Sequence, residues 1–435
     1  MIIILDPQKD AYVTNIKTKN NDGSISNVGH AATLDLFKLF NENKNAKSWA
    51  LLEFNNDNTK LITDGSTLTL KDSLGTQKIF EFDDNNNLLD QNNIQIDISN
   101  EKVANNGNGD NSTYAATIAA AINAVNNFEI IAYSNSNNQL LLKQNISGES
   151  GDTKIESNEF DSGNIILKNE YINEENEVIR KFSRIDYSLV LIKFDLESFK
   201  SNWNIGDSLS GAFDSLKADL ILKDVSTGIS KPKEYSLELL EFKKDFKEGI
   251  GKDTIHFSDK NFVNFNKINE GVYWEIPSLV SAEDAVSLAP SSTLDSSYTK
   301  LGDENLIFNI TEYIKQKIIS PETDFGFLIK FSDDIIFNNK SYFAKRLGSR
   351  HLINKKLIPQ LRIKIDDSTY NIPTNSFNKI RYLDNVEDFY LFNKANGNLI
   401  SFNKPDLNRN GWTIKFNIGN IITDKDTIIP TNFSG

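Results

Sequence analysis

The chain has 435 residues, of which 39% are hydrophobic and 10% aromatic, so its length and apolar content predict two or three folded domains. Its formal net charge of −13 argues against the basic surface that binds nucleic acid or an anionic membrane, and we expect neither as a partner. The absence of cysteine excludes disulfides, zinc–thiolate sites and cysteine nucleophiles.

The first residues, MIIILDPQKD, lack the positive charge and the long apolar run of a secretory signal peptide. No apolar run in the sequence approaches the roughly 20 residues that a membrane-spanning helix needs. We therefore expect a soluble chain that is not conventionally secreted.

The dominant pattern along the chain is an alternation of apolar and polar residues with a period of two. Leu34 and Leu36 flank Asp35 in TLDLFKL, and FGFLIKF at 325–331 and PQLRIKID at 359–366 repeat the pattern. Such alternation predicts strands with one buried and one solvated face. Because Asn-, Asp- and Gly-rich turns separate many such strands, we expect a β-sandwich or a barrel.

Two segments have helical periodicity instead. STYAATIAAAINAVNN, residues 112–127, places Ile118, Ile122 and Val125 on one face of an alanine-rich helix. NITEYIKQKIISP, residues 309–321, carries an apolar stripe, begins with a capping asparagine and stops at a proline. Each segment predicts one helix in a chain that otherwise consists of strands.

Two stretches of the sequence resemble each other. AKSWALLEFN at 46–55 and YSLVLIKFDL at 187–196 both have an apolar run, then a charge, then Phe, then Asn or Asp. The segment between them changes character, with a strand pair, a single strand, the first helix and two more strands. An inserted domain that interrupts an outer β-domain would explain this order. The alternative is a chance resemblance between two ordinary hairpins, since apolar strands of similar composition are common.

This interpretation predicts a mainly β protein with three parts. Residues 1–55 and 158–366 form a discontinuous, jelly-roll-like antiparallel β-sandwich. Residues 56–157 form an inserted small α+β domain, and residues 367–435 form a short C-terminal β element.

The sequence contains no recognisable catalytic motif. His30, His256 and His351 lack metalloprotein spacings such as HExxH, so we expect no metal centre and no other cofactor. The acidic clusters DDNNN at 83–87 and NGNGD at 106–110 could bind calcium through their oxygens, although solvated turns are the commoner role of such clusters. We therefore expect that the protein is not an enzyme.

The aromatic residues supply the candidate interface. Trp49 and Trp274 lie in strand-like runs and are expected in the core, whereas Trp203 and Trp412 sit beside turns and are expected at the surface. Interfaces between proteins are enriched in aromatic side chains. The predicted interface residues are Trp203, Trp412, Phe389 and Tyr390.

Taken together, the outer segments resemble the DNRLRE-type β-sandwich family. The motifs are DAYV at 10–13, Asn-Val-Gly at 27–29 before an apolar strand, LIKFD at 191–195, and Ser-Arg at 349–350 between the second helix and the last strand. No single motif is specific to the family, so the resemblance depends on the order in which the motifs follow one another along the chain. The chain departs from the family at His351, where the family usually has Glu, which puts the expected Arg–Glu pair in doubt.

The stretch SNVGHAATLDLFKLFNE, with WALLEFN after it, is similar to virion structural proteins of tailed phages. The inserted segment resembles a module that recurs in phage and adhesin proteins, through its residues 64–65, 80–83, 121–124 and 148–155. These resemblances imply a non-enzymatic virion component of the tail, baseplate, neck or capsid decoration. Its expected partners are other virion proteins and further copies of itself in a homo-oligomer. The alternative is a polysaccharide-binding adhesin module, at a fibre tip or on a cell surface, that contacts surface glycans.

Overall fold

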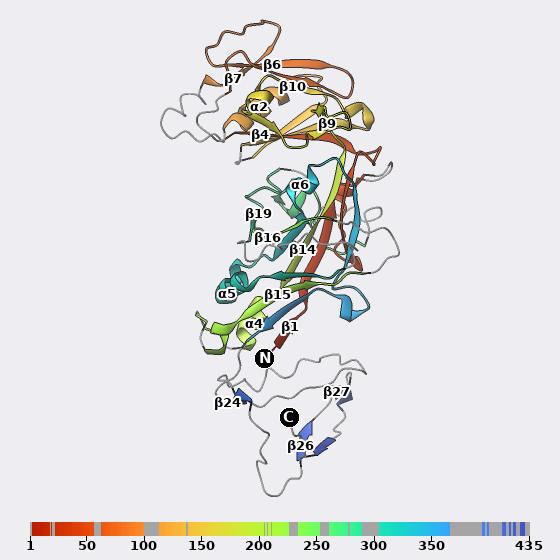
Figure 1. Cartoon of the computed structure of the whole chain (residues 1–435), viewed down its shortest axis with the longest axis vertical. Helices are drawn as coiled ribbons and strands as arrows, with labels where there is room; N and C mark the ends of the chain where they lie inside the picture. Colours follow the sequence, from red (N-terminus) through yellow and green to blue (C-terminus); the bar gives the residue numbers. More distant parts are fainter. Residues whose placement is uncertain are drawn as a thin grey trace.

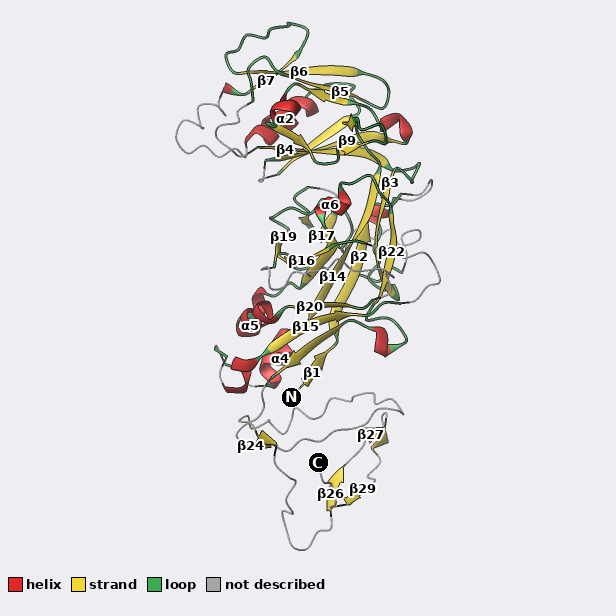
Figure 2. Cartoon of the chain, viewed as in Figure 1, coloured by secondary structure: helices red, strands yellow, loops and turns green. Residues whose placement is uncertain are grey.

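The protein is mainly β, as the alternating pattern predicts (Figures 1 and 2). The computed structural model describes residues 2–365 except 18, 20–21, 56–61, 100–112, 136–137, 204, 207, 210, 226–233, 253–260, 277–278 and 289–303. Beyond residue 365 it describes only the backbone of six short strands. Among the described residues, no helix has the length and apolar character needed to cross a membrane.

The outer part of the chain forms two antiparallel sheets whose side chains share one core, which confirms a β-sandwich-like architecture. One sheet has four strands, in the order β1 (Ile2–Leu5), β23 (Gln360–Lys364), β15 (Lys217–Leu222) and β20 (Leu306–Asn309). The other has seven: β19 (Ala285–Ser287), β16 (Leu237–Phe242), β21 (Phe327–Phe331), β14 (Ile185–Phe194), β3 (Thr33–Phe40) and β22 (Tyr342–Gly348), with β2 (Pro7–Thr14) paired to β14.

The long strand β14 is the centre of this sandwich. It pairs with β2, β3 and β21, and all its residues except Lys193 are buried. Its neighbour β21 is also buried on both faces, so the solvated face expected there is wrong. Lys330 of β21 tolerates this burial because its ammonium group meets the carboxylates of Glu238 at 2.7 Å and Asp333 at 2.5 Å.

The helix predicted near residue 309 is α5 (Thr311–Ile319), whose residues Tyr313, Ile314 and Ile318 face the core. Two further helices of the sandwich were not predicted, because they are too short to show a periodicity: α4 (Leu196–Asn202) and α6 (Asp333–Ile336). The side chain of Asp195 caps α4 by accepting the backbone N–H of Ser198. A small hairpin of β17 (Lys267–Asn269) and β18 (Val272–Tyr273) completes the sandwich.

The inserted domain has a core of its own between two four-stranded sheets. Helix α2 (Thr113–Asn123) is the predicted first helix, and it contacts β7, β8 and β9. The first sheet contains β10 (Ile155–Ser157), β5 (Thr67–Lys71), β6 (Gln77–Asp83) and β7 (Ile94–Asp97), with β6 and β7 parallel. The second contains β11 (Ile165–Leu167), β4 (Lys47–Phe54), β9 (Gln139–Ser147) and β8 (Ile130–Ser134). Helix α3 (Glu159–Ser162) and the hairpin of β12 (Tyr171–Ile172) and β13 (Val178–Ile179) follow.

The structure moves both boundaries that the sequence predicts for this domain. Strand β4 was assigned to the sandwich, but it pairs with β9 and β11 of the inserted domain. Phe182 also belongs to the core of the inserted domain. The domain therefore runs from about β4 to Phe182 instead of covering 56–157. The two similar stretches of sequence are strands of different domains, β4 in one and β14 in the other.

The chain leaves and re-enters the sandwich across a single strand pair. Phe40 at the end of β3 lies opposite Ile185 at the start of β14. Beyond this pair, the backbone N–H of Asn41 donates to the carbonyl oxygen of Arg184 at 2.7 Å. Figure 1 shows the inserted domain beyond this end of the sandwich. The insertion thus occupies the place of a hairpin turn.

Strand β4 has one face in each core, which fixes the inserted domain against the sandwich. Leu52 packs in the core of the inserted domain, whereas Trp49 and Leu51 join the sandwich core. The indole N–H of Trp49 donates to the carbonyl oxygen of Ile185 at 3.0 Å, and its ring meets Phe337 edge-on. Trp49 is thus in the core as predicted, and Trp274, with 3% of its surface exposed, is as well.

The fully buried Lys38 of β3 gives a prediction about pH. Its ammonium group donates to carbonyl oxygens of Asn338 and Lys340, and burial lowers its pKa to about 7. The unfolded chain keeps this proton until about pH 10, so the wild type gains stability as the pH rises through this window. Relative to Lys38→Met, the free energy of unfolding should rise by about 1–3 kcal/mol from pH 7 to pH 10. Urea unfolding at both pH values measures this, and an unchanged difference would contradict the lowered pKa.

The segment after residue 365 forms three short antiparallel pairs. They are β24 (Lys394–Ala395) with β25 (Asn398–Leu399), β26 (Gly411–Ile414) with β29 (Thr427–Pro430), and β27 (Asn417–Ile418) with β28 (Ile421–Ile422). Trp412 lies in β26 opposite Ile429. Its side chain lies outside the described part of the chain, as do Phe389 and Tyr390.

Candidate functional site

Of the four predicted interface residues, only Trp203 has a described side chain, and its expected exposure is wrong. Only 8% of Trp203 is exposed, and its ring packs against Phe199 and Phe213 at centroid distances of 6.1 and 6.2 Å. Trp203 directly follows the last residue of α4, and its backbone N–H donates to the carbonyl oxygen of Phe199 in that helix. The turn beside Trp203 misled the prediction, because a turn can direct a side chain inward as well as outward.

The described calcium candidate, residues 83–87, is a turn organised by one aspartate. Oδ1 of Asp83 accepts the backbone N–H groups of Asn85 at 3.0 Å and Asn87 at 3.1 Å. Its Oδ2 accepts an N–H from the side chain of Gln95 at 2.8 Å. Closing this turn accounts for the aspartate on structural grounds. The other candidate, 106–110, lies outside the described residues.

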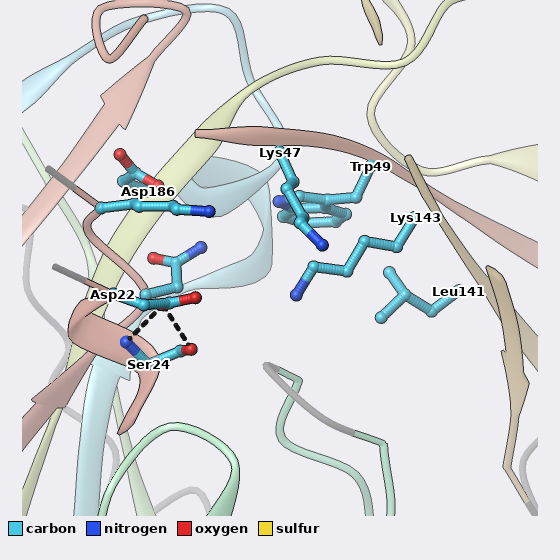
Figure 3. Close-up of a pocket in the computed structure, with 9 residues that line it drawn as sticks. Asp22, Ser24, Lys47, Trp49, Leu141, Lys143 and Asp186 are labelled. Carbon is cyan, nitrogen blue, oxygen red and sulfur yellow. Dashed lines mark hydrogen bonds between the residues drawn. The ribbon is translucent and has the colours of Figure 1, made fainter. Parts of the chain in front are cut away.

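A cavity of about 30 Å³ lies where the inserted domain meets the sandwich (Figure 3). Strands β4 and β9 supply Lys47 and Lys143, and β14 supplies Asp186. Such a volume holds about two water molecules. It lies between strands of the inserted domain and of the sandwich. Its lining residues are Asn15, Lys17, Asp22, Ser24, Lys47, Trp49, Leu141, Lys143 and Asp186.

Burial shifts the pKa values of Asp186 and Lys143, which line this cavity, in the direction that favours their uncharged forms. Burial raises the pKa of Asp186 to about 7, against the hydrogen bond from Asn43 and the charge of Lys143. Burial and the neighbouring Lys47 lower the pKa of Lys143 to about 8. Beside the cavity, Arg184 holds Asp152 through three N–H···O contacts of 3.0 to 3.2 Å. The contacts between Arg184 and Asp152 tie the inserted domain to the residue before β14.

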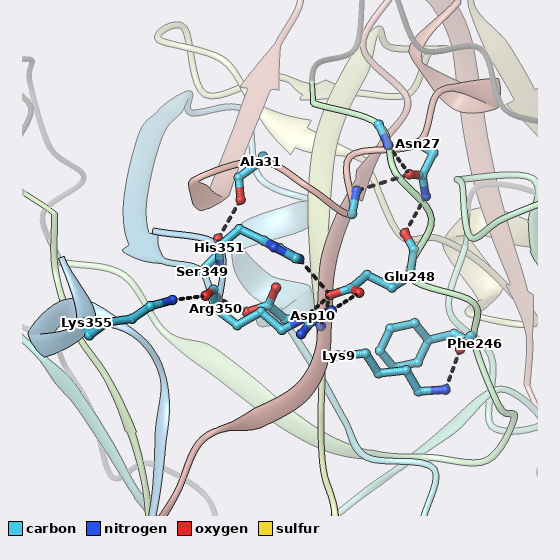
Figure 4. Close-up of polar contacts among 12 residues, drawn as sticks. Lys9, Asp10, Asn27, Ala31, Phe246, Glu248, Ser349, Arg350, His351 and Lys355 are labelled. Atoms are coloured by element: carbon cyan, nitrogen blue, oxygen red, sulfur yellow. Dashed lines mark hydrogen bonds and ion pairs between the residues drawn. The ribbon is translucent and has the colours of Figure 1, made fainter. Parts of the chain in front are cut away.

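A second polar site brings together the motifs that carry the family resemblance (Figure 4). Asp10 comes from β2, Asn27 from the loop before β3, and Arg350 from the turn after β22. The backbone N–H of Arg350 donates to Oδ2 of Asp10 at 2.6 Å. All three residues converge on Glu248, which the sequence analysis did not single out. We call Asp10, Asn27, Glu248, Arg350 and His351 the Glu248 cluster.

Arg350 has a carboxylate partner despite the departure at position 351. Its Nε and a terminal nitrogen donate to both oxygens of Glu248, at 2.6 and 2.5 Å. The backbone N–H of Asp10 donates to Glu248 at 2.9 Å, and His351 Nε2 lies 3.2 Å from the same oxygen. Burial opposes ionisation of Glu248, but these hydrogen bonds outweigh it and hold its pKa below the usual value.

Two loops interlock so closely at this site that only glycine fits. A Cβ on Gly29 would lie 1.8 Å from the carbonyl oxygen of Glu248, and one on Gly251 would lie 1.7 Å from that of Asn27. The side-chain amide of Asn27 donates to the carbonyl oxygen of Glu248 at 2.8 Å, and its oxygen accepts the backbone N–H of Gly251 at 2.9 Å. The paired glycines around Glu248 are the sequence signal that could have drawn attention to it.

The Glu248 cluster is therefore a rigid, charged junction between β2, β22 and two loops. Asp10 is fully buried, and burial raises its pKa to about 7.

Comparison of this chain with family models, curated proteins and solved structures finds no match.

Proposed function

We propose that this protein is a non-enzymatic structural component of a tailed-phage virion that acts through protein–protein assembly. The resemblances to virion proteins and to the DNRLRE-type sandwich motivate the proposal. One structural observation supports it most: the hairpin of β12 and β13 presents a pair of apolar side chains to solvent.

In this hairpin Ile172 lies directly opposite Val178, with 63% and 50% of their surfaces exposed. On the preceding position, Tyr171 turns inward and its ring meets Phe40 of β3 edge-on, with centroids 5.4 Å apart. The side chain of Asn173 closes the turn by accepting two backbone N–H groups. The hairpin is thus anchored on one side and apolar on the other.

Exposed paired apolar side chains add no stability to the free chain. Burial against a partner would remove them from water, and apolar side chains in the centre of an interface supply much of its binding energy. The partner that suits this hairpin is another protein surface, either a second copy or a neighbouring virion protein.

The substitution Ile172→Asp tests this. Because the side chain is exposed, we expect the free energy of unfolding to change by less than about 0.5 kcal/mol. Incorporation of the chain into purified particles, measured by mass spectrometry of separated heads and tails, should fall strongly. Ile353→Asp, at an isoleucine that is 96% exposed in the turn after β22, is the matched control and should be incorporated normally.

Normal incorporation of the Ile172→Asp chain would remove this hairpin from the assembly surface. A wild-type chain that stays monomeric and never occurs in particles, yet binds a purified polysaccharide, would favour the adhesin alternative. Turnover of a polysaccharide that one carboxylate substitution abolishes would contradict the non-enzymatic proposal.

A further inference from the structure

We propose that His30, His351 and Glu248 form a binding site for one divalent transition-metal ion of the zinc type. The three residues come from the loop before β3, the turn after β22 and the loop after β16, so no sequence spacing predicts that they meet. The nitrogen and oxygen atoms that they offer all lie within 4.8 Å of one another. The proposal does not depend on the assembly role argued above.

The geometry is close to that of a metal site without being closed. The two imidazole rings are 4.0 Å apart between centroids, and Nε2 of His351 lies 3.2 Å from Oε1 of Glu248. In a tetrahedral zinc site with bonds near 2.0 Å, neighbouring ligand atoms lie roughly 3.3 Å apart. One edge of the tetrahedron already has this length, and side-chain rotation can shorten the others.

The choice of ligands selects the class of ion. Two imidazoles and one carboxylate suit zinc, nickel, cobalt or copper, whereas calcium and magnesium prefer oxygen ligands alone. All three side chains are partly exposed, which gives an ion access and leaves room for water as a fourth ligand.

The surrounding contacts hold the ligands in place. Arg350 and the backbone of Asp10 orient the carboxylate of Glu248. The hydroxyl of Ser349 donates to the carbonyl oxygen of Ala31, next to His30, and accepts the backbone N–H of His351. This contact joins the two histidine-bearing segments, as outer contacts do around established metal sites.

The charges beside the site act in opposite directions. The guanidinium group of Arg350 shares Glu248 with the ion and weakens binding. The buried carboxylate of Asp10 favours a cation, and its Oδ1 accepts no hydrogen bond within the described part of the chain. We therefore expect weaker binding than at a structural zinc site, with the two imidazoles supplying most of it.

The test is calorimetric titration of ZnCl₂ into the full chain, freed of metal with a chelator and prepared without a histidine tag. The wild type should bind one ion per chain at the Glu248 cluster, and its thermal midpoint should rise with zinc concentration. His30→Ala and His351→Ala should each weaken this binding by about tenfold or more. His256→Ala replaces the third histidine of the chain and should bind as the wild type does.

A second readout separates coordination from a loss of folding. Cobalt bound by the imidazoles should give a visible absorption band that disappears in the double variant His30→Ala, His351→Ala, while its circular dichroism spectrum stays that of the wild type. Titration at pH 5 should show weaker binding, since protonated imidazoles bind no metal. A wild type that binds zinc no more tightly than the folded double variant would overturn the proposal.

Discussion

Leu191→Ala and Phe194→Ala should each lower the free energy of unfolding by about 2–5 kcal/mol, because each removes a large buried side chain from the sandwich core. Leu191 is fully buried and Phe194 is 1% exposed, and both lie in β14. Leu191 lies opposite Ala11 of β2 and Leu328 of β21, so the cavity would open at the centre of the sheet. Urea unfolding followed by tryptophan fluorescence measures the effect.

Leu51→Ala in β4 should have a cost in the same range, since this side chain belongs to the sandwich core although its strand belongs to the inserted domain. The matched control is Ile172→Ala, at a side chain that is 63% exposed, and it should cost less than about 0.5 kcal/mol. If the alanine substitutions at Leu191, Phe194 and Leu51 each lower the free energy of unfolding by less than about 1 kcal/mol, these strands are not the framework.

The largest effect on folding and solubility is expected from the choice of the two residues between which the inserted domain is deleted. Replacing residues 42–183 by Asn-Gly should leave a folded sandwich, because Asn41 and Arg184 are already hydrogen-bonded neighbours and Asn-Gly suits a two-residue hairpin turn. This variant loses Trp49, Leu51 and Leu141 from the sandwich core, so we expect it to be less stable than the full chain but soluble.

Removal of residues 56–157, the range that the sequence predicts, should give an insoluble chain. It takes away β8 and β9 but leaves β4 and β11 behind, with Leu52 and Phe54 exposed to water. Soluble yield and circular dichroism of the two deletion variants measure the difference. If both variants are equally soluble, the boundaries drawn here from strand pairing are wrong.

The contrast between these two variants shows what the sequence could and could not predict. The alternating pattern predicted the mainly β class and strands such as β3 and β23, and the helical periodicity predicted α2 and α5, because periodicity is a local property of the chain. The pairing partner of β4 is not local: its apolar run suits either domain, and only the folded structure shows that it pairs with β9. The same applies to β21, whose alternation did not show that both its faces are covered.

The polar sites depend even more on contacts between distant segments. Asp10, Asn27 and Arg350 stood in separate motifs, and the resemblance gave their order but not their meeting point at Glu248. The contact between His30 and His351 could not be predicted either. The two histidines are separated by 320 residues, and neither lies in a motif with metal-binding spacing. Trp203 was misplaced because its environment depends on how α4 packs.

The strand pair that carries the inserted domain also determines how the protein would respond to mechanical load. A pull on the inserted domain enters the sandwich at two adjacent points, Asn41 and Arg184, and passes along β3 and β14. Because ladder hydrogen bonds run perpendicular to antiparallel strands, a force along β14 loads its bonds to β2 in shear, all at once. The ladder between β14 and β2 would therefore resist such a pull better than bonds that break one after another.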